Sequence, residues 1–263
     1  MAGFKNQSKS ALVGAIALAL FSAACQRTPS RNRIDENHLP RIVLWAWERP
    51  EDLEFLDPQR FGVAFLAQTL TLKNNDVLYN PRHQPLKVSP ATKLIAVTRI
   101  ESQKVTRERS ELSDEQRRKL AEHIRKTLEL ENVKAIQVDF DAATSERVFY
   151  RQLLEELRRE LPDSVPLSMT ALASFCVGDL WLSDLPVDEA VPMVFRMGTD
   201  SDRIKHMLAS GGDFRDGLCK RSYGVSLDEP VTTSFAKQRR VYVFNDRAWT
   251  AADVAVLEER FGR

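Results

Sequence analysis

The sequence predicts an α/β protein built as a (β/α)8 barrel of the TIM type, irregular in its first units. Eight short apolar runs alternate with amphipathic helical segments along the chain. The runs are almost continuously apolar, which is typical of parallel strands buried on both faces. The chain has 263 residues, a natural length for one such barrel. An open parallel sheet is the alternative, but no glycine-rich nucleotide loop follows the first run.

The eight predicted strands are apolar runs bounded by polar or turn-forming residues. Parallel strands of a barrel end at the same mouth, where enzymes of this fold place their active sites. The polar residues that follow each run are therefore the first candidates for a site. The predicted strands span residues 42–47, 62–72, 94–97, 135–140, 166–171, 190–195, 223–227 and 241–244.

Four helices are predicted from their capping signals and apolar spacing. Ser113 and Gln116 form a capping box ahead of leucines and an isoleucine spaced four apart, and Thr250 with Asp253 forms another. A helix over residues 145–161 ends at a proline, and a further helix follows Asp200. No internal repeat or domain boundary is visible, so residues 41–263 are predicted to form a single domain.

The segment from Asn74 to Pro90 is the main irregularity. It is rich in proline and asparagine and has no helical period. It is predicted to be either a long loop over one mouth of the barrel or a small hairpin. Residues 101–109 are highly charged and are expected to be solvated.

Residues 1–24 have the layout of a signal peptide: two lysines, an apolar run over residues 11–21, and then Ser22-Ala23-Ala24. Small residues before Cys25 resemble the lipobox of bacterial lipoproteins, which implies acylation of Cys25 and a membrane anchor. Residues 25–40 would then be the tether, and Gln26 after the cysteine resembles sorting to the outer membrane, facing the periplasm. Ser22 stands where that pattern usually has leucine, so a soluble secreted or periplasmic protein remains the alternative.

Charge and cysteine content exclude some partners. The formal net charge is +1, and the leader carries two lysines and no acid, so the mature chain is at about −1 and no nucleic-acid partner is expected. Cys176 and Cys219 remain after Cys25, and they are either a disulfide or two buried thiols. The four histidines are scattered and no zinc spacing occurs, so no metal and no cofactor is predicted.

Paired carboxylates follow the fourth predicted strand. Asp139 and Asp141 are two residues apart and face the same side, with Phe140 on the other side. Two carboxylates inside a barrel are costly and repel each other, so a functional site is favoured over helix capping or pairing with Arg196. Glycoside hydrolysis needs two carboxylates on different strand ends, and Glu229 after the seventh strand is the predicted partner of Asp141. The predicted substrate-binding residues are Glu48, Arg196, Asp228, Asn245, Trp47 and Trp249.

Several segments resemble a bacterial family known as domain of unknown function number 3142. The likeness runs from about Arg41 to Trp249 and implies the fold without an agreed chemistry. A weaker likeness is to chitinase-like barrels, whose fourth strand ends D-G-x-D-x-D-x-E. Asp139 and Asp141 match its last two aspartates, but Ala143 stands at the position of the acid glutamate. The segments that carry the first resemblance are VLWAWERPEDL, GVAFLAQTLTL, IQVDFDA, PLSMTALASFC, VDEAVPMVFRMG and GVSLDEP.

Two functions follow from these observations. The first is a glycoside hydrolase-like lipoprotein that acts on envelope or extracellular polysaccharide through Asp141 and Glu229, with Asp139 assisting. The second is a lipid-anchored module without catalysis that holds a glycan or a protein. A nucleophilic hydrolase is disfavoured, because no G-x-S-x-G elbow occurs in the sequence.

Overall fold

The computed structural model describes residues 1–3, 39–229 and 235–262. The predicted signal peptide beyond residue 3, the lipidation site Cys25 and the tether up to residue 38 lie outside the described residues. None of the helices described is long and apolar enough to cross a membrane.

Eight parallel strands form a closed barrel, which confirms the predicted fold. Each strand pairs with the next around the ring, and β1 pairs in parallel with both β11 and β3, which closes it. All eight strands overlap the eight apolar runs of the sequence. In barrel order they are β1 (Ile42–Ala46), β3 (Phe61–Lys73), β6 (Leu94–Ser102), β7 (Val133–Asp139), β8 (Leu167–Leu172), β9 (Glu189–Met193), β10 (Ser222–Ser226) and β11 (Arg240–Phe244).

The strands bury side chains on both faces, which explains their continuous apolar character. Val43, Trp45, Ile95 and Tyr242 belong to a cluster inside the barrel. Alternate residues of the same strands, such as Leu44, belong to a larger cluster that includes the apolar faces of the helices. Each strand is therefore packed from inside and outside at once.

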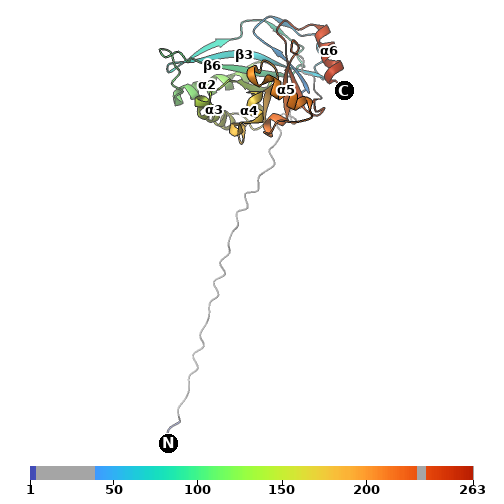
Figure 1. The fold of residues 1–263 in the computed structure, drawn as a ribbon. Helices are drawn as coiled ribbons and strands as arrows, with labels where there is room; N and C mark the ends of the chain where they lie inside the picture. The colour runs from blue at the N-terminus through green and yellow to red at the C-terminus, as the bar shows by residue number, and fades with distance from the viewer. Residues whose placement is uncertain (4–38, 230–234, 263) are drawn as a thin grey trace. The chain divides into compact units, whose positions relative to one another are not determined.

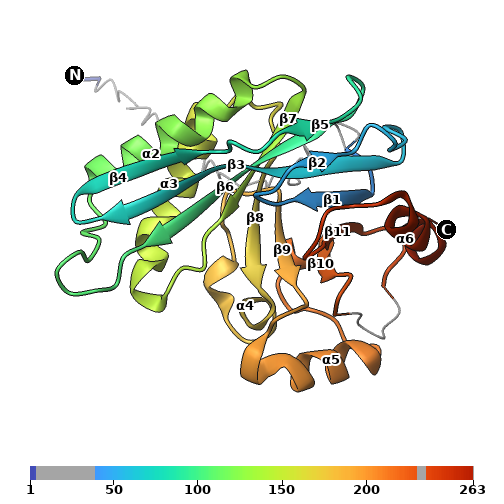
Figure 2. The ribbon, with the colours of Figure 1, turned by 90° about the horizontal axis from the view of Figure 1, so that it is seen from above.

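The predicted helices are confirmed, and both capping boxes are present, at Ser113 and at Thr250. Helices α2 and α3 lie side by side along the barrel (Figures 1 and 2). The structure adds α4, whose five residues are too few to show a helical period in the sequence. The helices are α2 (Asp114–Lys126), α3 (Arg147–Glu160), α4 (Ala173–Val177), α5 (Ser201–Ala209) and α6 (Ala251–Phe261), with 3-10 turns at Thr127–Glu129, Thr144–Glu146, Leu180–Leu182, Gly198–Asp200 and Leu218–Lys220.

The irregular segment is a hairpin and not a long loop. Strand β3 continues past the end of β1, and β4 (Asp76–Pro81) pairs with it in antiparallel fashion. Asn74, with φ of 49°, makes the tight turn between them. Two further short strands, β2 (Glu51–Asp52) and β5 (Leu86–Lys87), pair beside the barrel. The hairpin of β3 and β4 therefore extends the barrel wall beyond the end of β1.

A β-bulge in β3 changes which side chains face the barrel interior. The pairing with β6 shifts between Leu66 and Gln68. As a result Gln68 points outward and donates to the carbonyl oxygen of His123 in α2, at 3.1 Å. Thr69 lines the interior cavity instead. Because of the extra residue in β3, the hydroxyl of Thr69 faces the cavity and the amide of Gln68 does not.

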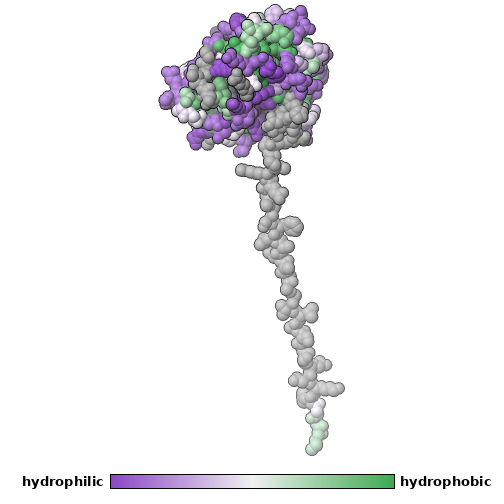
Figure 3. Space-filling view, turned by 90° about the vertical axis from the view of Figure 1, so that its right-hand side faces the viewer, coloured by the Kyte–Doolittle hydropathy of each residue, from purple (hydrophilic) through white to green (hydrophobic). Residues whose placement is uncertain are grey.

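Cys176 and Cys219 form a disulfide, with their Cα atoms 5.8 Å apart. Both are buried within the larger apolar cluster. The backbone N–H of Arg215 donates to the carbonyl oxygen of Cys176, at 2.8 Å, so the segment before β10 returns to α4. Figure 3 shows that the described surface on the side of α6 is largely hydrophilic, with a smaller hydrophobic area.

Candidate active site at the barrel mouth

The carboxyl ends of the strands surround a cavity of about 540 Å³. Its wall is aromatic on one side, where Phe195 and Phe244 stack with ring centroids 5.6 Å apart and Trp47 packs edge-on against Phe244. Its polar side carries four carboxylates and two arginines. The polar residues that line it are Glu48, Thr69, Arg99, Glu101, Asp139, Asp141, Thr170, Ser174 and Arg196.

Asp139 is the most buried of these carboxylates, with 6% of its surface exposed. It ends β7 and accepts hydrogen bonds from the hydroxyl of Thr170, at 2.6 Å, and from the guanidinium of Arg99, at 3.2 Å. Burial raises the pKa of Asp139, and this outweighs the lowering by Thr170 and Arg99. The site therefore contains one carboxyl group that holds its proton more tightly than usual.

Arg99 connects the polar side of the cavity to its aromatic wall. Its guanidinium pairs with Glu101 at 3.0 Å and with Asp139, and it lies over the ring of Trp47, 5.6 Å from the centroid. Two carboxylates keep the pKa of Arg99 raised despite its burial. No role for Arg99 was predicted from the sequence. The sequence did contain a pattern that indicates its position, because Arg99 and Glu101 have the same two-residue spacing as Asp139 and Asp141 on the neighbouring strand.

Asp141 is exposed and lines the same cavity as Asp139. Phe140 points the other way and packs against Tyr150, with centroids 5.2 Å apart. The alternation expected from the sequence therefore holds here. Glu146 does not replace the glutamate that Ala143 lacks, because its carboxylate accepts the N–H of Ala143, at 2.6 Å, and the hydroxyl of Ser102.

Glu229, the predicted partner of Asp141, and Asp228 do not line the cavity that Asp141 lines. Glu229 pairs with Lys205 at 2.7 Å and accepts the backbone N–H of Arg196 at 2.9 Å. The hydrogen bond from Lys205 lowers its pKa. Arg196 has φ of 50°, a left-handed conformation that is costly for arginine. Glu229 therefore supports the turn that places Arg196 at the cavity rim, and Asp228 pairs with Arg196 at 3.5 Å.

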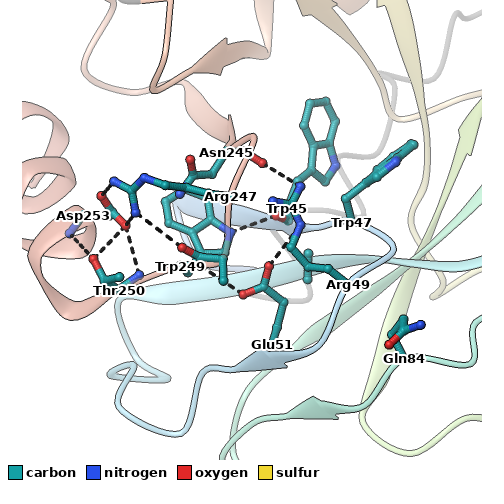
Figure 4. Close-up of polar contacts among 12 residues, drawn as sticks. Trp45, Trp47, Arg49, Glu51, Gln84, Asn245, Arg247, Trp249, Thr250 and Asp253 are labelled. Carbon is teal, nitrogen blue, oxygen red and sulfur yellow. Dashed lines mark hydrogen bonds and ion pairs between the residues drawn. The ribbon is translucent and has the colours of Figure 1, made fainter.

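Trp249 and Asn245 also lie outside the cavity lining, in a buried network behind it (Figure 4). The Trp249 backbone N–H donates to Glu51, at 3.0 Å, and its indole N–H donates to the carbonyl oxygen of Trp45, at 2.9 Å. The Asn245 carbonyl oxygen accepts from Arg49 at 3.2 Å. These residues hold the end of β1 in place, and the side chain of Trp249 is buried among them.

Of the substrate-binding residues predicted from the sequence, Glu48, Trp47 and Arg196 line the cavity. The backbone that carries Trp47 and Glu48 is held by Arg82, at the end of the β4 hairpin. The Arg82 guanidinium donates to the carbonyl oxygens of Trp47 and Arg49, at 2.5 Å each. Among the residues described, no cluster of His, Cys, Asp and Glu is suited to a metal ion.

The raised pKa of Asp139 predicts a pH-dependent stability. At pH values between the ordinary pKa of an aspartate and the raised pKa of Asp139, the folded state binds more protons than the unfolded state. The free energy of unfolding should therefore fall as pH rises through this window. We expect Asp139→Asn to remove that part of the slope, measured by urea denaturation between about pH 4 and pH 8. Asp202→Asn, an exposed change on α5, is the control, and parallel profiles for Asp139→Asn and wild type would contradict the prediction.

Comparison with known proteins supports the fold. Residues 90–194 match the family described as a domain of unknown function (DUF3142), a shorter span than the resemblance seen in the sequence. A Streptomyces coelicolor protein assigned as chitinase A aligns with a TM-score of 0.55 and 11% identity, over 86% of this chain and 98% of that one.

The chitinase domain of the spore coat protein CotE from Clostridium difficile overlaps more loosely, with a TM-score of 0.38 and 13% identity, over 63% of this chain and 53% of that one. None of the curated proteins matches the sequence. The resemblance to the DUF3142 family is confirmed over residues 90–194, and the Streptomyces coelicolor structure shares the barrel fold of this chain.

Proposed function

We propose that this protein is a glycoside hydrolase-like enzyme that acts on envelope or extracellular polysaccharide at the mouth of the barrel. The observation that carries the proposal is the cavity itself, where four carboxylates face an aromatic wall in a space of about 540 Å³. Aromatic faces suit the apolar faces of sugar rings, and carboxylates supply the acid and base of glycoside hydrolysis. The barrel fold shared with the Streptomyces coelicolor protein assigned as chitinase A is consistent with this chemistry.

Asp141 is the proposed acid or base, because it is exposed to the cavity at the end of β7. Glu48, at the end of β1, replaces Glu229 as its proposed partner, since Glu101 already pairs with Arg99 and Glu229 with Lys205. One carboxyl group protonates the leaving oxygen, and the other attacks the sugar or activates water. Asp139 holds Arg99 in place beside them.

The decisive test follows the release of reducing ends from chitin oligosaccharides, peptidoglycan fragments and secreted polysaccharides. We expect Asp141→Asn to lower the rate of hydrolysis by about 100-fold or more, because general acid–base catalysis supplies about that factor. Asp202→Asn has the same chemical change outside the cavity and should keep the wild-type rate. Full activity of Asp141→Asn on a genuine substrate would remove Asp141 from the mechanism.

A second candidate function is a glycan-binding module without catalysis. The observation that favours it is the missing acid, because Ala143 stands at the glutamate position and Glu146 is used to cap the turn after β7. Equal binding of one glycan by wild type and Asp141→Asn, with no product from either, would support this function.

The proposed location is the bacterial envelope, with acylated Cys25 in the outer membrane and the barrel facing the periplasm. Support comes from the apolar leader and the small residues before Cys25.

A further inference from the structure

The amino ends of the barrel strands carry a second cavity, of about 310 Å³, at the opposite end from the proposed active site. It is lined by five cationic side chains and a single carboxylate. We call it the basal patch. Its residues are Leu39, Arg41, Glu189, Lys220, Arg221, Gln238, Arg239 and Arg240.

The basal patch contains more cationic side chains than carboxylates that pair with them. Glu189 pairs with Arg240 at 3.6 Å, and Asp213 pairs with Arg239 at 2.5 Å. Arg41 and Lys220 form no ion pair within the part of the chain that the structure describes. Burial lowers the pKa of Arg41, and no carboxylate raises it back. Arg41 and Lys220 are therefore the side chains that give the patch its positive charge.

Backbone contacts hold the guanidinium groups of the patch in place. Arg41 donates to the carbonyl oxygen of Arg239, at 3.0 Å, and Arg221 donates to that of Asp188. Arg240 donates to the carbonyl oxygens of Leu39 and Pro40. These backbone carbonyl oxygens fix the orientation of the three guanidinium groups.

The basal patch also surrounds the point where the predicted tether joins the barrel. Leu39 lines it, and residues 26–38 are all that separate Leu39 from Cys25. A segment of this length spans at most about 50 Å when fully extended. A lipid on Cys25 would therefore keep this end of the barrel close to the membrane.

We propose that the basal patch docks on the membrane surface by binding the phosphates of anionic phospholipids. The proposal rests on the lipid anchor proposed above for its location and on the described residues for its charge. A basic patch at an anionic surface gains about one kcal/mol for each lysine or arginine near that surface. Lys220 and Gln238 are the exposed members that such a surface meets.

The test uses the predicted mature chain, residues 25–263 with Cys25→Ala, so that neither the apolar leader nor a lipid contributes to vesicle binding. We expect this protein to sediment with vesicles that contain phosphatidylglycerol and not with phosphatidylcholine alone, and to be released by salt. Adding Lys220→Glu should weaken binding about tenfold. Lys104→Glu makes the same charge change at the opposite mouth and should leave binding unchanged.

Each outcome bears on one proposal. Equal binding by the Lys220→Glu and Lys104→Glu proteins, equal binding to both vesicle types, or no binding at all overturns membrane docking by the patch. The lipid anchor is tested separately, by whether a labelled fatty acid is incorporated into the wild-type chain and not into Cys25→Ala. A wild-type chain without the label overturns the anchor and leaves the vesicle result to be judged independently.

Discussion

Replacing Cys219 with serine is expected to lower the free energy of unfolding by about 2–5 kcal/mol. The disulfide joins residues 43 apart in sequence, and the loop it closes contains β9 and α5. Cross-linking a loop of this length restricts the unfolded chain, and the chain-entropy estimate is about 4 kcal/mol. Both sulfur atoms are buried, so serine also introduces a hydroxyl into an apolar cluster.

Chemical denaturation of wild type and Cys219→Ser under oxidising conditions measures the difference. The Cys176→Ser/Cys219→Ser double variant is the matched control and should resemble the single variant, because one bridge is lost in both. Wild type in the presence of a reductant should approach them. An unchanged midpoint after reduction would show that the bridge contributes no stability.

The second large effect is expected from Glu189→Ala at the base of the barrel. Glu189 is fully buried, accepts the hydroxyl of Tyr242 and pairs with Arg240, whose side chain is 9% exposed. Burial and the Glu189 carboxylate raise the pKa of Tyr242, which therefore stays a neutral donor. Glu189→Ala removes a buried ion-pair partner of Arg240 and the acceptor of the Tyr242 hydroxyl, so we expect a loss of about 3–5 kcal/mol.

Glu101→Ala provides the comparison, because Glu101 also pairs with an arginine but is exposed. Exposed pairs contribute up to about 1 kcal/mol, so this change should have a small effect on unfolding. Urea denaturation of both variants at neutral pH measures the contrast. Similar losses in the free energy of unfolding for Glu189→Ala and Glu101→Ala would mean that burial does not determine the strength of these ion pairs.

The barrel could be predicted because its strands are buried on both faces. This makes β7, for example, an apolar run that ends in a visible pair of acids. Alternation along the strand also predicted that Asp139 and Asp141 share a face. Asp139 ends β7, and Asp141, two residues beyond, lines the same cavity. Helix α4 was missed, because five residues cannot display a helical period.

Glu229 could not be placed from sequence because it lies beyond the end of β10, where the alternation of a strand no longer fixes direction. Its orientation depends on Lys205 and on the left-handed turn at Arg196, contacts that come from other loops. The same reason applies to Trp249, whose position depends on the buried Glu51. Loop residues need the tertiary structure, whereas strand residues carry their direction in the sequence.

The tether joins the barrel at the amino ends of its strands, and the carboxylate cavity opens at their carboxyl ends. For a protein anchored through Cys25, this polarity determines which polymers it meets. With that anchoring, glycan strands that extend away from the lipid surface would reach the cavity, whereas sugars on lipid headgroups beneath the barrel would not. Glycan cleavage would then be confined to a shell of fixed depth above the membrane, and lengthening the tether would widen that shell without any change at the active site.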